Sequence, residues 1–89
     1  MFDSRRSEIE IINDILKLSV DGAKKTEILY QGNLSYTLLR NYLGILLKTQ
    51  VLEEKVINNN GNGSTKLYIT TNKGHELLRD IDKMMSHFR

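Results

Sequence analysis

In the first twenty residues, apolar side chains recur at intervals of three and four, the spacing of one face of a helix. They include Ile9, Ile12, Leu16 and Val20, and they predict a helix over residues 5–19. Ser4 or Ser7 can cap its N-terminus, and Gly22 is placed to end it.

Two further helices are expected, separated by a sharp turn. The first is short and covers residues 24–31, and it is followed by Gly32 and Asn33, which both tolerate a positive φ. Ser35 is a favourable cap for the next helix, which is expected to run to about residue 49. The predicted buried face of that helix consists of Leu38, Leu39, Tyr42, Leu43, Leu46 and Leu47.

After Gln50 the apolar pattern changes from a helical period to one typical of strands. Residues 51–57 and 66–70 are two short β-type runs, and the Asn- and Gly-rich residues 58–65 between them indicate a hairpin loop. Thr71 can then cap a last helix over residues 72–88.

The order of these elements is that of a winged helix-turn-helix: helix, short helix, turn, helix, hairpin, helix. We therefore predict an α+β, mostly α fold with three helices, a two-stranded wing hairpin and a C-terminal dimerisation helix. In this prediction residues 1–71 form the winged-helix domain. Residues 72–89 form the C-terminal helix, which is the dimerisation element of the same domain.

The distribution of charge along the chain says more than the total. The net charge is +2, but residues 28–75 carry +3 and the remainder carries −1. No acidic residue lies between Glu54 and Glu76. This surplus is expected of a face that meets a polyanion, and ordinary solvated charge is the alternative interpretation.

The polar face of the third predicted helix is the main candidate for binding double-stranded DNA. This face carries no acid and presents Ser35, Tyr36, Thr37, Arg40, Asn41 and Lys48. A helix about 10–12 Å across fits the roughly 12 Å wide major groove. Arg40 can pair with guanine there and Asn41 with adenine, while Tyr36 and Thr37 can reach a phosphate or a thymine methyl. The alternative is the solvated face of an amphipathic helix.

Two smaller groups are candidates for contacts with the DNA backbone. Lys24, Lys25 and Thr26 begin the second helix, and the first helix of a helix-turn-helix pair crosses the backbone. The hairpin offers Asn60, Asn62, Ser64 and Lys66, which can lie along phosphates or in the minor groove. A solvated corner and a plain hairpin turn are the respective alternatives.

The last predicted helix carries more apolar surface than a core of this size readily covers. Its stripe consists of Leu77, Leu78, Ile81, Met84, Met85 and Phe88, and we expect the last turns to be exposed and to form a homodimer seam. The alternative is that this helix folds back over its own domain.

Little in the sequence supports catalysis. The absence of cysteine excludes disulfides and thiolate metal sites, and His75 and His87 form no recognisable metal spacing. We therefore expect no enzyme activity and no metal, cofactor or small-molecule ligand. There is no apolar run of membrane-spanning length and no signal peptide, so we expect a cytoplasmic, nucleoid-associated protein that does not enter membranes.

Several segments resemble the small archaeal winged-helix DNA-binding proteins, which include the dimeric ten-kilodalton chromatin-type "ten-a" family and related predicted transcription regulators. The similar segments are residues 22–29 (GAKKTEIL), Asn33-Leu34-Ser35-Tyr36, Tyr42-Leu43 with Leu46-Leu47, and the strand-to-helix junction at residues 68–78. The resemblance implies a winged-helix domain that dimerises through its C-terminal helix and acts on double-stranded DNA, as a transcription regulator or a chromatin protein. The alternative function is a winged-helix module that binds other proteins and does not contact DNA.

Overall fold

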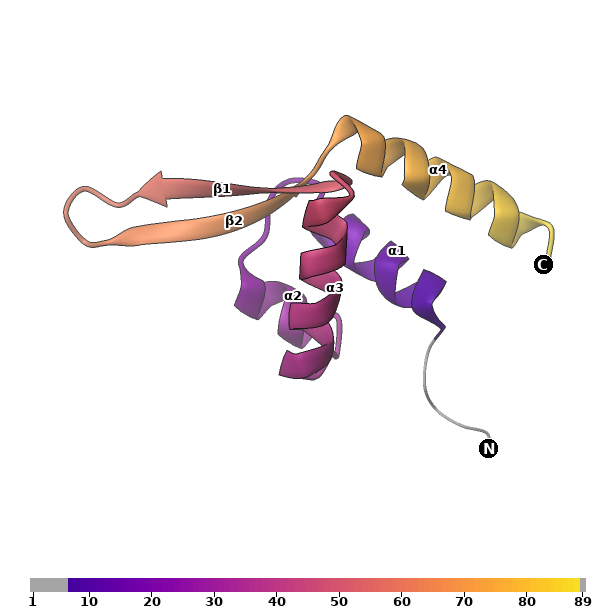
Figure 1. Ribbon diagram of the computed structural model, residues 1–89, viewed down its shortest axis with the longest axis horizontal. Helices are drawn as coiled ribbons and strands as arrows, with labels where there is room; N and C mark the ends of the chain where they lie inside the picture. The colour runs from indigo at the N-terminus through magenta and orange to yellow at the C-terminus, as the bar shows by residue number, and fades with distance from the viewer. Residues whose placement is uncertain (1–6, 89) are drawn as a thin grey trace.

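The computed structural model describes residues 7–88. Within this range lie four helices and a two-stranded antiparallel sheet, in the order α1 (Glu8–Leu18), α2 (Lys25–Gln31), α3 (Tyr36–Lys48), β1 (Leu52–Asn58), β2 (Ser64–Thr70) and α4 (Asn72–Ser86). The β1–β2 hairpin extends from one side of the body formed by α1–α3, and α4 extends toward the other side (Figure 1). The predicted α+β, mostly helical winged-helix fold is confirmed.

The first helix, predicted over residues 5–19, runs from Glu8 to Leu18, and residues 5 and 6 lie outside the described residues. Ser7 caps it in a reciprocal pair with Glu10, whereas the alternative cap, Ser4, lies outside the described residues. The helix ends at Leu18, not at Gly22, and Gly22 occupies the following turn at φ +91°. Val20 therefore follows the helix instead of lying on its inner face, and it is exposed.

In the turn between α2 and α3, the two residues that tolerate a positive φ adopt different conformations. Asn33 takes the left-handed conformation at φ +53°, while Gly32 stays at φ −81°. Gly32 is instead required by close packing, since a Cβ there would lie 2.6 Å from the carbonyl oxygen of Ile28. Ser35 caps α3 as predicted, and its hydroxyl accepts a hydrogen bond from the Leu38 amide at 3.1 Å.

The core lies between α1, α2, α3 and the base of the hairpin. Its fully buried apolar side chains are Ile15, Leu16, Ile28, Leu39 and Leu52. The buried stripe of α3 is narrower than predicted: Leu39, Tyr42, Leu43 and Leu46 are buried, but Leu38 is exposed and Leu47 is only partly buried. Ile9, expected to face inward from α1, is also exposed, and it lines an apolar groove with Leu77 and Met84 of α4.

The hairpin is longer and its loop shorter than expected. The strands pair from Leu52 with Thr70 to Asn58 with Ser64, which leaves residues 59–63 as the loop. Beyond the hairpin, Ala23 exchanges two backbone hydrogen bonds with Tyr68, at 2.8 and 3.0 Å. This bridge fixes the α1–α2 connection to the outer edge of β2.

At the junction between β2 and α4 the last helix is fixed to the body. Thr71 caps α4 as predicted, and its hydroxyl also donates to the carbonyl oxygen of Gln50 at 2.7 Å. A Cβ on Gly74 would lie 2.1 Å from the carbonyl oxygen of Val51, so only glycine fits at this position. The helix then packs against α1 and ends at Ser86, two residues before the predicted end.

Among residues 7–88, no helix combines the length and the apolar character needed to cross a membrane.

Candidate nucleic-acid interface

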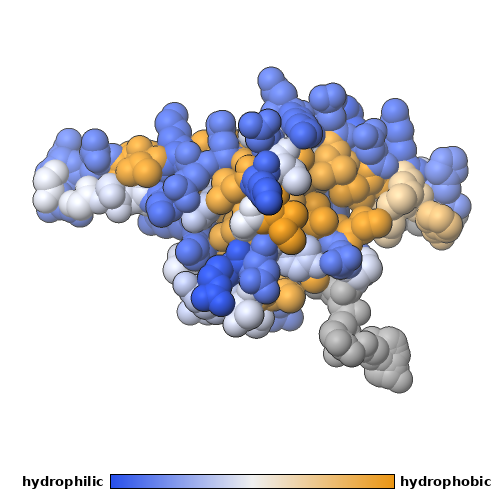
Figure 2. Space-filling view, viewed as in Figure 1, coloured by the Kyte–Doolittle hydropathy of each residue, from blue (hydrophilic) through white to orange (hydrophobic). Residues whose placement is uncertain are grey.

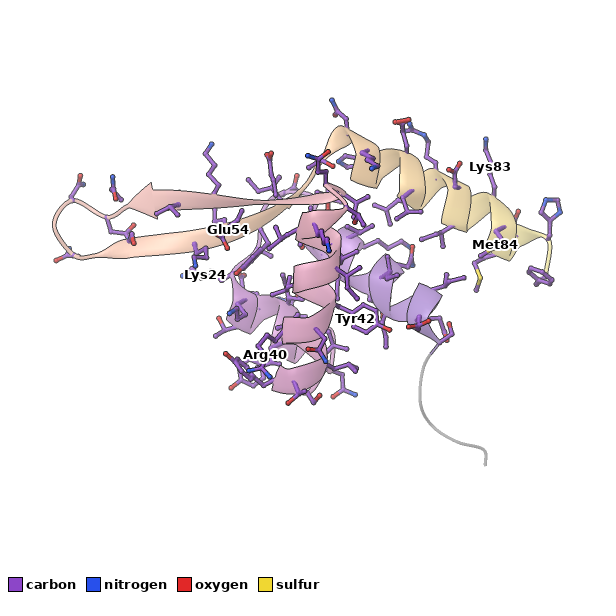
Figure 3. All side chains as sticks on the ribbon, viewed as in Figure 1. Lys24, Arg40, Tyr42, Glu54, Lys83 and Met84 are labelled. Atoms are coloured by element: carbon purple, nitrogen blue, oxygen red, sulfur yellow. The ribbon has the colours of Figure 1, made fainter. Side chains whose placement is uncertain are left out.

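The outer face of α3 is open to solvent. All of its predicted contact residues are exposed, namely Ser35, Tyr36, Thr37, Arg40, Asn41 and Lys48. Arg40 lies near the N-terminal end of α3, away from both the hairpin tip and α4 (Figure 3). The nearest acid that follows along the chain is Glu53, beyond the end of the helix. This face can therefore meet a polyanion without displacing any described part of the chain.

A tyrosine ring brings together cations from two helices. The Lys25 ammonium lies 5.8 Å from the centre of the Tyr36 ring, and the Arg40 guanidinium carbon lies 5.8 Å from the same centre. Lys25 is the first residue of α2, and Tyr36 is the first residue of α3. Both distances fall within the range of cation–π attraction. Two basic residues from different helices are thus gathered at the open end of the helix-turn-helix.

The start of α2 also contains an acid. Lys24 and Thr26 are exposed, as a role in DNA contact requires. The carboxylate of Glu27 accepts a hydrogen bond from the Lys24 amide at 2.8 Å and so caps the helix. That carboxylate reduces the net charge of this corner, although its hydrogen bond directs it toward the backbone.

The predicted contact residues of the hairpin lie in two places, the loop and strand β2. Asn60, Asn62 and Ser64 are exposed in or beside the loop, which is held by a hydrogen bond from the Asn59 side-chain amide to the Thr65 hydroxyl at 2.7 Å. Lys66 instead lies within β2, where its ammonium is 3.7 Å from a carboxylate oxygen of Glu54. Lys66 therefore already has an anionic neighbour within the chain.

Glu54 also interacts with a buried tyrosine at the base of the wing. The pKa of Tyr68 is raised above its usual value, first by burial and then by the charge of Glu54 and hydrogen bonding with it. The smallest contribution to this raised pKa comes from the ionised form of Tyr36. Lys66, Glu54 and Tyr68 thus form one polar group at the wing.

The sequence interpretation did not assign a role to Glu54. The signal that could have found it is the alternation of a strand, which places Glu54 on the same face as buried Leu52. Cross-strand pairing with Tyr68 then turns it toward the helices.

The apolar stripe of α4 divides into a covered and an open part. Ile81 is buried, and Leu77 and Leu78 pack against the core from partly buried positions. Met85 is partly buried, Met84 is exposed and Phe88 is 81% exposed. Beside this helix runs a groove of about 820 Å³ that is lined by Ile12, Ile45, Leu77 and Asp80 among others. Figure 2 shows apolar surface gathered between α3 and α4.

A family model described as winged helix-turn-helix matches residues 5–88. The chain belongs to the winged helix-turn-helix family. An uncharacterized protein of Methanocaldococcus jannaschii is 33% identical to this winged-helix chain over 81 residues, which cover 90% of this chain and 34% of that protein. The chain thus spans about a third of the length of this curated relative.

Solved structures show the same winged-helix fold. Sso10a-2, described as a DNA-binding protein from Sulfolobus solfataricus, is 28% identical and superposes with a TM-score of 0.75, over 91% of this chain and 80% of that one. Diamide-treated YodB from B. subtilis is 20% identical with a TM-score of 0.72, over 93% and 78% of the two chains. A possible transcriptional regulator from Methanosarcina mazei Go1 is 12% identical with a TM-score of 0.59, over 92% and 72%. At these identities, the last two show the fold alone.

Proposed function

We propose that this winged-helix domain binds double-stranded DNA and that α3 is its recognition helix. The observation that carries the proposal is the exposed, acid-free outer face of α3, with the cations of Lys25 and Arg40 gathered at its N-terminal end. An α-helix of about 10–12 Å fits the major groove, and its N-terminal residues meet the base edges. The description of Sso10a-2 as a DNA-binding protein supports the same function.

Within this proposal, the exposed side chains divide into two roles. Arg40 and Asn41 contact base edges, because their planar ends match guanine and adenine. The remaining contacts go to the backbone, which fixes orientation without reading sequence. The residues proposed for these are Lys24, Lys25, Thr26, Ser35, Thr37, Lys48, Asn60, Asn62, Ser64 and Lys66, with the ring of Tyr36 beside Lys25 and Arg40.

We further propose that the protein acts as a homodimer through the open end of α4. Phe88 is the most exposed large apolar side chain among residues 7–88, and Met84 lies four residues before it. Met84 lines an apolar groove together with Leu77 and Asp80 of the same helix. Burial of this surface in a second copy would present two recognition helices to half-sites about 34–36 Å apart. Such a dimer suits a transcription regulator or a chromatin protein of the nucleoid.

A titration of mixed-sequence duplex DNA at several salt concentrations tests the main proposal. If each protomer neutralises roughly three phosphates, log affinity should fall with log salt at a slope near −5 for a dimer. Retention of the duplex that weakens with salt supports DNA binding. No retention at micromolar protein and low salt would overturn it and would favour a module that binds another protein.

Light scattering across a range of protein concentrations tests the dimer. Phe88→Ser should shift the protein toward the monomer, because it removes the largest exposed apolar side chain of the proposed seam. Tyr30→Ser is the matched control, since Tyr30 is 79% exposed on α2, away from that seam. A wild-type protein that remains monomeric at all concentrations, or equal effects of the two variants, contradicts the dimer proposal.

A further inference from the structure

The ring of Tyr36 lies beside basic residues of both α2 and α3. It lies at the first turn of α3, is 55% exposed, and has a cation from each of two helices at 5.8 Å from its centre. A tyrosine that only contacted DNA would not need to hold the basic side chains of Lys25 and Arg40 near its own ring. The arrangement therefore calls for a role within the protein itself.

A tyrosine ring orients a cation without neutralising it. The attraction comes from the quadrupole of the ring, so the full positive charge stays available to a phosphate or a base. A carboxylate also orients a cation but offsets part of its charge, as Glu54 does beside Lys66. Only the first kind of partner prepares a cation to bind an anion.

Orienting a cation before it binds DNA reduces the entropy cost most when its side chain is long. Lysine and arginine lose much rotamer freedom when they are fixed against DNA, and this loss opposes binding. A ring that already restricts both side chains in the free protein reduces the loss on association. Because Lys25 and Arg40 come from different helices, one ring aligns both elements of the helix-turn-helix.

We infer that Tyr36 is a positioning residue, which holds Lys25 and Arg40 together as one charged clamp for the DNA backbone and the neighbouring base edge. This inference rests on the proposed DNA binding and adds to it a specific task for the Tyr36 ring. The hydroxyl group of Tyr36 is not needed for that task.

The free protein provides the first test, without DNA. Side-chain protons of Lys25 and Arg40 that lie over the face of the Tyr36 ring shift upfield in the NMR spectrum. These upfield shifts should be present in the wild type, retained in Tyr36→Phe and lost in Tyr36→Leu. Circular dichroism confirms that both variants fold, as expected for a side chain that is more than half exposed. Absence of the shifts in the folded wild type would overturn the inference.

Affinity for duplex DNA provides the second test. Tyr36→Leu should weaken binding by about threefold to tenfold, and Tyr36→Phe should stay within about twofold of the wild type. Tyr30→Leu is the control for loss of an exposed tyrosine and should leave affinity unchanged. Equal losses in the Phe and Leu variants would show that the hydroxyl group is what acts, and unchanged affinity in Tyr36→Leu would show that the ring does not. Either result overturns the inference while the wild type still binds.

A double variant separates positioning from simple contact. In an Arg40→Ala, Lys25→Ala background, Tyr36→Leu should have little further effect on affinity, because the ring then has no cations to hold. The same loss in both backgrounds would mean that the ring contacts DNA directly and would overturn the inference. Failure of the proposed function is distinguishable from all these results, because the wild type itself would then retain no duplex.

Discussion

The helix-turn-helix and the wing both carry cations at the surface, but the partners of those cations differ. Lys25 and Arg40 flank the neutral ring of Tyr36, whereas Lys66 on β2 faces the carboxylate of Glu54 at 3.7 Å. The first pair keeps its full charge, and Lys66 has part of its charge compensated within the chain. Basic residues on one proposed DNA-binding surface therefore differ in how much charge they offer to a polyanion, and a count of lysines and arginines overlooks this.

This difference predicts that the helix-turn-helix and the wing contribute to DNA binding in different ways. The cations beside Tyr36 would provide most of the electrostatic attraction to DNA, while the wing would contribute mainly through uncharged groups of its loop. Asn60 and Asn62 are exposed there and can hydrogen-bond to phosphate or sugar without a charge. The variants that follow are ordered by the size of effect that this difference predicts.

Arg40→Ala should have the largest effect on binding. The loss should be about 1–3 kcal/mol at the base position that Arg40 reads, with weaker sequence preference there. Competition titrations with duplexes that vary one base pair measure it. Lys83→Ala removes an equal charge from α4, at the other end of the molecule from the hairpin (Figure 3), and serves as the control. Equal losses in both variants would indicate that only net charge matters.

Glu54→Gln should increase affinity for DNA. The substitution frees Lys66 for a phosphate and removes a negative charge near the interface, so the salt slope should become steeper by about one. An ion pair this exposed contributes only about 0.2–1 kcal/mol, so the gain is modest. Glu53→Gln is the matched control, because Glu53 lies on the opposite face of the same strand. Weaker binding by Glu54→Gln would contradict the comparison.

Lys66→Ala should have a small effect in the wild type and a larger one beside Glu54→Gln. In the wild type the lysine is already partly compensated, and its loss should cost less than about 0.5 kcal/mol of binding free energy. A double-mutant cycle over positions 54 and 66 measures the difference. Additive effects would show that the ion pair does not influence the contact with DNA.

The smallest expected effect concerns stability at high pH. The pKa of Tyr68 is raised in the folded state, so its contribution to stability is complete below the usual value of 10.0 and declines as pH rises through the raised pKa. Glu54→Gln should shift the Tyr68 titration toward lower pH and leave burial as the main cause. Tyrosinate absorbance detects the change, and Tyr42 serves as an internal reference because its pKa is raised by burial and Glu8 instead. An unchanged Tyr68 titration would mean that Glu54 does not act on it.

Local signals explain why most elements were predictable from the sequence. Ser35 and Thr71 cap their helices through hydrogen bonds over three residues, and such contacts depend on nearby sequence alone. The wing hairpin was likewise predictable from its Asn-Gly turn, where Gly61 adopts φ +88°.

The remaining features depend on tertiary contacts. The period of a strand does not reveal which side chain will meet Lys66, because that depends on cross-strand register and on the helices beneath. For the same reason, the cations around Tyr36 were predicted as separate contacts and not as a group. The exposure of Leu38 could not be predicted either, because the width of the buried stripe depends on what packs against α3. The residue contacts with DNA stay predictions.

Gly74 gives the far end of α4 its direction. Its missing side chain lets the first turn rest on the carbonyl of Val51, where a Cβ would approach to 2.1 Å. A helix rises about 1.5 Å per residue, so Met84 lies about 15 Å further along, and a tilt of about 10° at the junction would move it by about 2–3 Å. The direction of α4 is therefore set at its first turn, where Gly74 has only a hydrogen atom as its side chain. The position of the surface that a partner would contact at the C-terminal end of α4 therefore depends on the packing at its N-terminal end.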